Sequence, residues 1–357
     1  ASWAARIPAL RDALALGPAQ LGLVLLGGGI GAVASFPLAA WLVAHCGARG
    51  AAWRAGLALL LTLPCLALAP SMALLTALMF VLGAASSCFD VAINGLAAEA
   101  EQAAGRSIMS LLHAWFCVGT LSGALLAGAL AALGLAPPAH LSLIALLLAL
   151  PLWLAWRVLP NDRPQRRPTI AAAGRSWLSL PHGPLLALGV IGFCGAITEG
   201  AIAEWSGLFM KDHLAVGDGM APMAFAAFTG TMLVARLGAD RLKDRFSARR
   251  VVMHGSLLAA LGIFIALLAP ALGLSLFGFA LAGGGVAAVF PFVFSAAGRH
   301  GALALAGVAT MSYSGGLLGP PWIGFLAHSF GLQAALMFVG LLSLVVAAAA
   351  SRSRLLR

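Results

Sequence analysis

The sequence predicts an all-α polytopic membrane protein in which twelve spans form two six-helix bundles, with the first span incomplete. Three observations carry this expectation. Of the 357 residues, 62% are hydrophobic and 9% are charged, and the mean hydropathy is +1.01, unlike a soluble globular domain. Apolar runs of about 20 residues, long enough to cross a bilayer, recur along the chain. Forty-three glycines suit helices that pack closely in lipid.

Eleven complete spans fit between breaks marked by charge, proline or glycine. The first residues, ASWAARIPALRDALAL, predict the last turns of a truncated helix and then a short amphipathic stretch, without the pattern of a cleavable signal peptide. The complete spans are expected at 18–44, 52–69, 71–98, 107–134, 138–159, 183–210, 220–240, 249–269, 271–296, 302–327 and 331–350.

A polar segment rich in proline and arginine, residues 160–180, predicts a cytoplasmic linker. It separates an N-terminal bundle, residues 1–159, from a C-terminal bundle, residues 181–357. The loops after the second and eighth spans, WLVAHCGARGAAWR and DRLKDRFSARRVV, carry basic residues at the same relative place. This weak similarity between the two halves of the chain is typical of transporters built from repeats.

The positive charge is concentrated on one side of the predicted topology. Alternating crossings put 17 of the 21 Lys and Arg residues on the side that holds the C-terminus. The positive-inside rule assigns that side to the cytoplasm. The net charge of +10 is thereby explained, and we expect no nucleic-acid partner because few cations lie on a water-facing surface.

Two predicted spans of the first bundle carry polar residues at membrane depth, where ionisable groups are functional candidates. In the fourth span, Asp90 and Asn94 lie one turn apart and predict a polar stripe facing a cavity; the alternative is a hydrogen bond between packed helices. In the fifth span, His113 can exchange protons near neutral pH, and Trp115 can stack on a sugar ring. A capping or packing role for His113 is the alternative.

The stretch TEGAIAEWSG in the seventh span holds Glu199 and Glu204. Five residues correspond to about 140° around a helix, so the two acids do not form a shared carboxylate pair. We expect Glu199 to face the cavity, and Glu204 to lie at the external mouth beside an interfacial Trp205. Tyr313, the single tyrosine of the chain, is a further candidate for contacting a ligand.

Arg236 and Asp240 in the eighth span have the i, i+4 spacing of an ion pair. Asp240 also opens the run DRLKDRFSARR, whose further charged residues include Arg241, Asp244 and Arg245. This run resembles the signature loop of the major facilitator superfamily, roughly G-x-x-x-D-R-x-G-R-R. The resemblance implies the major-facilitator fold and a cytoplasmic gate formed by these five residues.

The N-terminal copy of that loop departs from the signature. Ala44 and His45 stand where the Asp-Arg pair is expected, although Gly47 and Arg49 remain, which puts an ion-pair latch at this loop in doubt. The stretches DVAING, GRSIMSLLHAWF, EGAIAEWSG and ARLGADRL resemble a bacterial branch of the superfamily near the fucose-permease-like sugar transporters.

These features predict a secondary active transporter of a small solute that works by alternating access. We expect proton-coupled symport, a sugar or polyol substrate, no cofactor or metal, a monomer, and a multi-pass location in the bacterial inner membrane. Proton-driven efflux of drug-like or cationic compounds is the alternative. A membrane-embedded enzyme is disfavoured because HExxH is absent and the eight histidines are scattered singly. A nucleotide-driven pump is disfavoured because no phosphate-binding loop is present, and a channel because repeated filter segments are absent.

Overall fold

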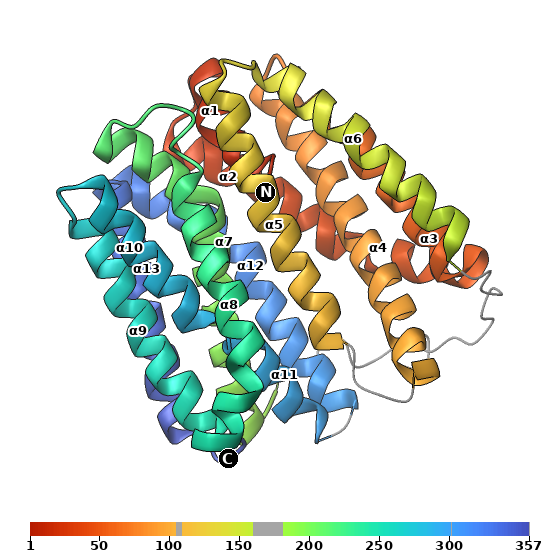
Figure 1. Cartoon of the computed structure of the whole chain (residues 1–357), viewed down its shortest axis with the longest axis vertical. Coiled ribbons are helices and arrows are strands. Elements are labelled where there is room, and N and C mark those ends of the chain that lie inside the picture. The colour runs from red at the N-terminus through yellow and green to blue at the C-terminus, as the bar shows by residue number, and fades with distance from the viewer. Residues whose placement is uncertain (105–108, 160–180, 301, 357) are drawn as a thin grey trace.

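A computed structural model describes residues 1–104, 109–159, 181–300 and 302–356, and every regular element in these ranges is a helix (Figure 1). The linker predicted at 160–180 lies outside the described residues. The elements up to the linker are η1 (Ala4–Arg6), α1 (Ile7–Ala13), α2 (Pro18–Ala34), α3 (Phe36–Ala67), α4 (Met72–Ala104), α5 (Met109–Ala132) and α6 (Pro137–Val158). Those after it are α7 (Pro184–Leu214), α8 (Met223–Phe246), α9 (Ala248–Leu268), α10 (Leu272–Val286), α11 (Val289–Gly298), α12 (Ala302–Phe330) and α13 (Leu332–Arg352).

The helices follow the expected spans closely. Most expected spans correspond to one helix, and α10 and α11 together occupy the span expected at 271–296. The spans expected at 18–44 and 52–69 share α3, which is interrupted at Gly47. Eight segments of the described chain are long and apolar enough to cross a membrane. The all-helical membrane fold is therefore confirmed, whereas the count of twelve spans and the truncation of the first stay predictions.

The paired basic loops turn with the same backbone shape. Gly47 interrupts α3 with φ 72° and ψ 166°, and Ser247 joins α8 to α9 with φ 74° and ψ 148°. Both are followed by Ala-Arg. A positive φ is easy for glycine and strained for serine, so the shared shape reflects the matching place of the two turns rather than the residue type.

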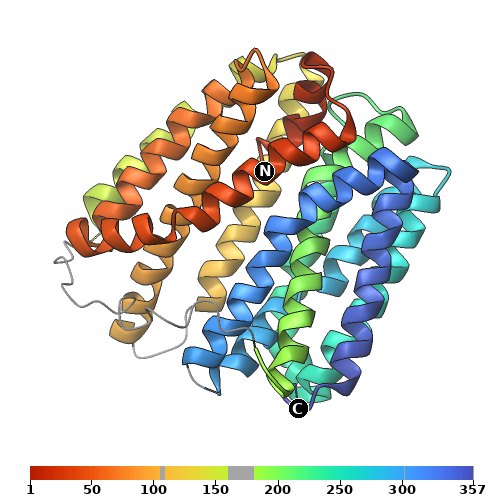
Figure 2. The same cartoon turned by 180° about the vertical axis from the view of Figure 1, so that it is seen from behind.

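The helices before and after the linker meet along two main seams, where α2 packs against α12 and α5 packs against α8, and η1 and α1 also contact α7. Figures 1 and 2 show α5 and α12 running through the middle of the molecule, with α3 and α6 on one flank and α9 and α13 on the other. The main buried core joins α7 to α13 with α2, and two small clusters rich in alanine pack α3 against α4. A seam between two helix groups is where transporters place their sites.

Glycines set the closest helix crossing among those before the linker. A Cβ added to Gly83 of α4 would collide with the backbone carbonyl of Gly28 in α2, and one added to Gly31 would collide with the carbonyl of Phe80. Backbones that approach this closely leave no room for a side chain. The α2–α4 contact therefore depends on glycine at these positions.

Candidate functional site

The guanidinium of Arg236 in α8 binds groups from three other helical segments. Its Nη2 lies 3.5 Å from Oε1 of Glu199 on α7, its Nη1 lies 3.0 Å from the Sγ of Cys117 on α5, and its Nε donates to the carbonyl of Ala287 at 3.3 Å. The Arg236 and Glu199 side chains are 17% and 27% exposed. We call this group the Arg236 site.

Local backbone structure explains how these groups come together. The helix pair α10 and α11 is interrupted at Ala287 and Ala288, just after the run Gly283–Gly285. An interrupted helix leaves carbonyls without intrahelical partners, and Ala287 offers one to Arg236. The α5–α8 seam brings Cys117 from the other side of the linker. The Arg236 site thus joins both helix groups.

A second polar region lies on α4 and α12. Asp90 is exposed and interacts electrostatically with the hydroxyl of Tyr313 on α12. The ring of Tyr313 is 54% exposed and its centroid lies 6.5 Å from that of Phe294 on α11. The side-chain amide of Asn94 donates to the backbone carbonyl of Asp90 at 2.9 Å. Asp90 and Tyr313 thus belong to different helix groups, and the charge of one acts on the hydroxyl of the other.

The other expected ligand-contacting residues are on α5. Trp115 is 65% exposed on this helix, as a side chain available for stacking has to be. The side chain of His113 lies outside the described residues.

Glu204 and Trp205 differ from the expected mouth. Trp205 is fully buried and its indole nitrogen has no hydrogen-bond partner among the described residues. The expectation of an interfacial Trp205 is therefore wrong for this structure, because the ring packs into the core around α7. Glu204 is partly buried, and its Oε2 is enclosed without a described hydrogen-bond partner.

Five charged residues bridge α1 to the end of α7 and the connection that follows it. The guanidinium of Arg11 donates to both carboxylate oxygens of Asp212 at 2.5 and 2.9 Å. Lys211 contacts Asp12 and Asp218, each at 2.9 Å. This α1–α7 charge cluster lies at the end of the molecule opposite the C-terminus (Figure 1), and it ties a segment before α2 to the second helix group.

The ionisation of Asp12 keeps the charge cluster intact at ordinary pH. Burial acts to raise the pKa of Asp12, but hydrogen bonds from Lys211 and Arg11 outweigh it and bring the pKa below its ordinary value. A lowered carboxyl pKa stabilises the folded contact above the ordinary Asp range, about 3.9, and that stabilisation is lost as the pH falls through the lowered value. Acidification to about pH 5 should leave the cluster closed.

Reversing one charge should open the cluster. Arg11→Glu removes the partner of Asp212 and adds a fourth carboxylate around Lys211, so repulsion replaces attraction. Each exposed pair contributes only about 0.2–1 kcal/mol, so we expect a wider separation of the segments rather than unfolding. Spin labels at the exposed positions 13 and 217 allow the distance between α1 and the connection after α7 to be measured by double electron–electron resonance.

The matched control exchanges the two charges, because Arg11→Glu with Asp212→Arg restores an opposite-charge pair. The double variant should return the distance distribution toward that of the unmodified protein, and high salt should widen the distribution in the unmodified protein. An unchanged distance in Arg11→Glu would show that the cluster does not hold these segments together.

The expected cytoplasmic gate is only partly described. Arg241, Asp244 and Arg245 are exposed, and none of them forms an ion pair with another described side chain. The side chain of Asp240 lies outside the described residues, so its pairing with Arg236 stays a prediction. The described ion-pair partner of Arg236 is Glu199.

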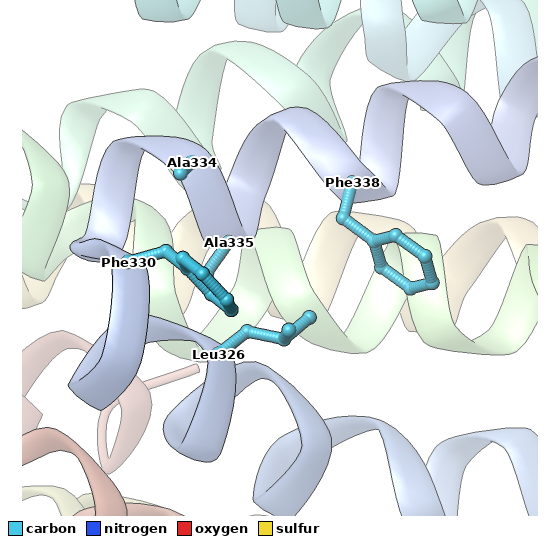
Figure 3. Close-up of a pocket in the computed structure, with 5 residues that line it drawn as sticks. All are labelled: Leu326, Phe330, Ala334, Ala335 and Phe338. Atoms are coloured by element: carbon cyan, nitrogen blue, oxygen red, sulfur yellow. The ribbon is translucent and has the colours of Figure 1, made fainter.

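An apolar pocket lies between the end of α12 and the start of α13 (Figure 3). It has a volume of about 280 Å³ and is lined by Leu326, Phe330, Ala334, Ala335 and Phe338. Phe330 is 73% exposed. The lining has no polar side chain to orient a hydrophilic solute, so this pocket is a poor candidate for a transport site.

Sequence reasoning missed two groupings. It treated Glu199 and Arg236 separately because they lie 37 residues apart, and helical periodicity reveals only neighbours on the same helix. It also gave no role to Arg11, Asp12, Asp212 and Asp218. A usable signal was present, since charges are scarce on that side of the predicted topology and two of these acids adjoin its few cations.

Membrane-spanning helices in two groups, with a charged site on one seam between them, define a multi-pass transporter. The chain belongs to the Major Facilitator Superfamily, whose family model matches residues 2–301. It is therefore a membrane transporter of a solute and not an enzyme, and the resemblance found in the sequence is confirmed.

Relatives and solved structures agree with this assignment. An uncharacterized MFS-type transporter of Yersinia pestis is 35% identical over 98% of this chain and 91% of its own length. The membrane protein MosC of Rhizobium meliloti is 31% identical over 98% and 85%. The nucleoside transporter NupG matches the fold with a TM-score of 0.75 at 19% identity, over 98% of this chain and 94% of its own. The E. coli fucose:proton symporter FucP matches with a TM-score of 0.59 at 16% identity, over 98% and 95%.

Proposed function

We propose that this chain is a proton-coupled symporter in which Glu199 carries the proton. The observation that supports this most is the contact between Glu199 and Arg236, 3.5 Å apart, on the α5–α8 seam. A carboxyl at membrane depth is retained for a function by default, because its ionised form is costly in an apolar medium.

The contacts of Arg236 suggest how protonation is coupled to movement. An ionised Glu199 attracts the guanidinium, whereas a protonated Glu199 offers no opposite charge. Arg236 also contacts Cys117 from the other helix group. Loss of the ion pair therefore changes a contact between the two bundles, 1–159 and 181–357, that we propose rock against each other. A contact with two arrangements is what alternating access requires.

Asp90 is the second acid in the proposal. Its charge acts on the hydroxyl of Tyr313 in the second helix group. Protonation or substrate binding at Asp90 would change this electrostatic interaction too. Each helix group thus contributes one acid to the proposal, and Glu199 reaches the other group through Arg236 and its contact with Cys117.

We propose a neutral sugar or polyol as the substrate. The exposed rings of Trp115 and Tyr313 suit stacking on a sugar, and Asp90 and Asn94 suit hydrogen bonding to hydroxyl groups. FucP is a fucose:proton symporter, and the proposal extends that pairing of a sugar with a proton to this chain. Acids and aromatic rings also bind cations, so efflux of drug-like or cationic compounds is the second candidate.

The proposed orientation follows from the distribution of basic residues. The C-terminus and the residues expected to form a cytoplasmic gate lie in the cytoplasm, and the α1–α7 charge cluster lies on the external side. With that cluster closed, the external side of the transporter is closed. The bacterial relatives support a location in the bacterial inner membrane, where we propose that the chain works as a monomer.

Transport in proteoliposomes tests the proposal. A thermal-shift screen against sugars, polyols and amphiphilic cations first identifies a ligand by its stabilisation of the folded protein. Uptake is then measured with and without an inward proton gradient. Glu199→Gln and Asp90→Asn should abolish gradient-driven accumulation. The control is Glu99→Gln, which changes an exposed acid near the end of α4 and should accumulate substrate normally. Full gradient-driven uptake in both Glu199→Gln and Asp90→Asn would refute the coupling proposal.

A further inference from the structure

The surroundings of Glu204 separate it from the Arg236 site. Five residues after Glu199, it lies about 7.5 Å further along α7 and about 140° around its axis. Its Oε2 is enclosed and has no hydrogen-bond partner among the described residues. A buried carboxylate without a partner is unfavourable, whereas its protonated form carries no charge to compensate. This side chain therefore needs either a proton or an opening to water.

The face of α7 that carries Glu204 is covered toward the charge cluster. Gly207 and Lys211, three and seven residues further on, share this face. A Cβ placed on Gly207 would lie 3.5 Å from the carbonyl oxygen of Ala221 and 3.8 Å from Cγ of Pro8 in α1. Lys211 forms its ion pair with Asp12, also in α1. The segment α1 thus covers α7 on this side of Glu204.

The face of α7 that carries Glu204 is open toward the start of the helix. Gly200, four residues before Glu204, lies one turn away on this face. A Cβ placed on Gly200 would have no other atom within 4 Å. Glu204 therefore lies between a closed contact with α1 and open space beside Gly200.

The elements packed around α7 carry several charged groups, and two of their arginines bind partners other than Glu204. Arg6 donates to Nδ1 of His140 at 2.7 Å and to the carbonyl of Leu135 at 2.8 Å. Arg236 contacts Glu199. Further titratable groups on or beside these elements are Arg11, Asp12, Lys211, Asp212 and Asp218 of the charge cluster, His213 stacked on Phe209, Tyr313 and His328 of α12, Arg352 of α13, and Arg241, Lys243, Asp244 and Arg245 of α8. Of the described residues, none forms an ion pair with Glu204.

We propose that Glu204 is a second proton-binding site, distinct from Glu199, whose access switches when α1 moves. With the charge cluster open, the carboxylate accepts one proton from water on the α1 side and forms an O–H bond. With the cluster closed, as in this structure, that bond breaks and the same proton passes to water in the space beside Gly200. This inference rests on the proposed proton-coupled transport and assigns it a second carrier.

Infrared spectroscopy tests the site without any substrate. The carbonyl stretch of a protonated carboxylic acid is recorded while the purified protein is titrated with base. Glu204→Gln should remove one such band, and Glu204→Asp should keep a band with a changed position or midpoint. The exposed acid in Glu99→Gln is the control, and its loss should leave the Glu204 band in place. An unchanged infrared titration in Glu204→Gln would overturn the proposal.

The coupling role is measured by transport of the ligand found in the thermal-shift screen. Glu204→Gln should lose accumulation above the equilibrium level while it keeps exchange of labelled for unlabelled ligand without a gradient. Accumulation equal to that of the unmodified protein would overturn the proposal. The two proposals can fail independently. If Glu199→Gln keeps normal uptake while the infrared band of Glu204 is present, only the assignment of Glu199 as a proton carrier is rejected.

Discussion

Arg236→Met is expected to abolish gradient-driven uptake and to lower the thermal stability of the purified protein. The substitution removes the three contacts that the guanidinium makes with described residues and leaves Glu199 without its counter-charge. Removing one partner of a fully buried pair costs roughly 3–5 kcal/mol. The partial exposure of both side chains makes a smaller loss the expected result here, because water solvates part of the remaining charge.

Two matched variants separate charge from packing in this experiment. Arg236→Lys keeps the positive charge but not the planar fork, so it should recover part of the stability and little of the uptake. Arg236→Met combined with Glu199→Gln removes both charges, and its melting temperature should rise above that of Arg236→Met alone while uptake stays absent. Normal uptake in Arg236→Met would exclude the Arg236 site from transport.

Gly83→Val is expected to destabilise the helices before the linker. Its side chain would collide with the backbone carbonyl of Gly28, which cannot rotate away as a flexible side chain would. Overpacking typically costs about 1–3 kcal/mol, and a collision with backbone belongs at the upper end. Thermal unfolding in detergent, followed by size-exclusion chromatography, measures the effect.

The same substitution at an open glycine controls for the loss of glycine itself. A Cβ on Gly119 of α5 would meet no other atom within 4 Å, so Gly119→Val should unfold close to the temperature of the unmodified protein. Gly83→Ala should fall between Gly83→Val and the unmodified protein. Equal melting temperatures for Gly83→Val and Gly119→Val would mean that α2 and α4 do not cross as closely as described.

Hydropathy and the positions of charged, proline and glycine residues were sufficient to predict the helices, because both signals depend on residues near one another in the chain. The loops expected around Gly47 and at the run DRLKDRFSARR are reduced to Gly47 and Ser247 in the structure, and α8 continues to Phe246, beyond the expected end at 240. The site was less accessible, since the contact of Arg236 with Glu199 depends on how α7 and α8 pack. Trp205 shows the same limit: aromatic residues near a span end favour the membrane interface, but tertiary packing buries this ring.

The break between α10 and α11 limits how this transporter can diversify. One of the three contacts of Arg236 is made by the main chain of Ala287, and a main-chain oxygen is the same whatever residue occupies that position. Among the described contacts of Arg236, substitutions can alter directly the α5 thiol and the α7 carboxyl. We therefore expect relatives that transport other solutes to keep the break between α10 and α11 and to vary the side chains around Arg236. The carbonyl oxygen of residue 287 would then stay in place while the rest of the site changes.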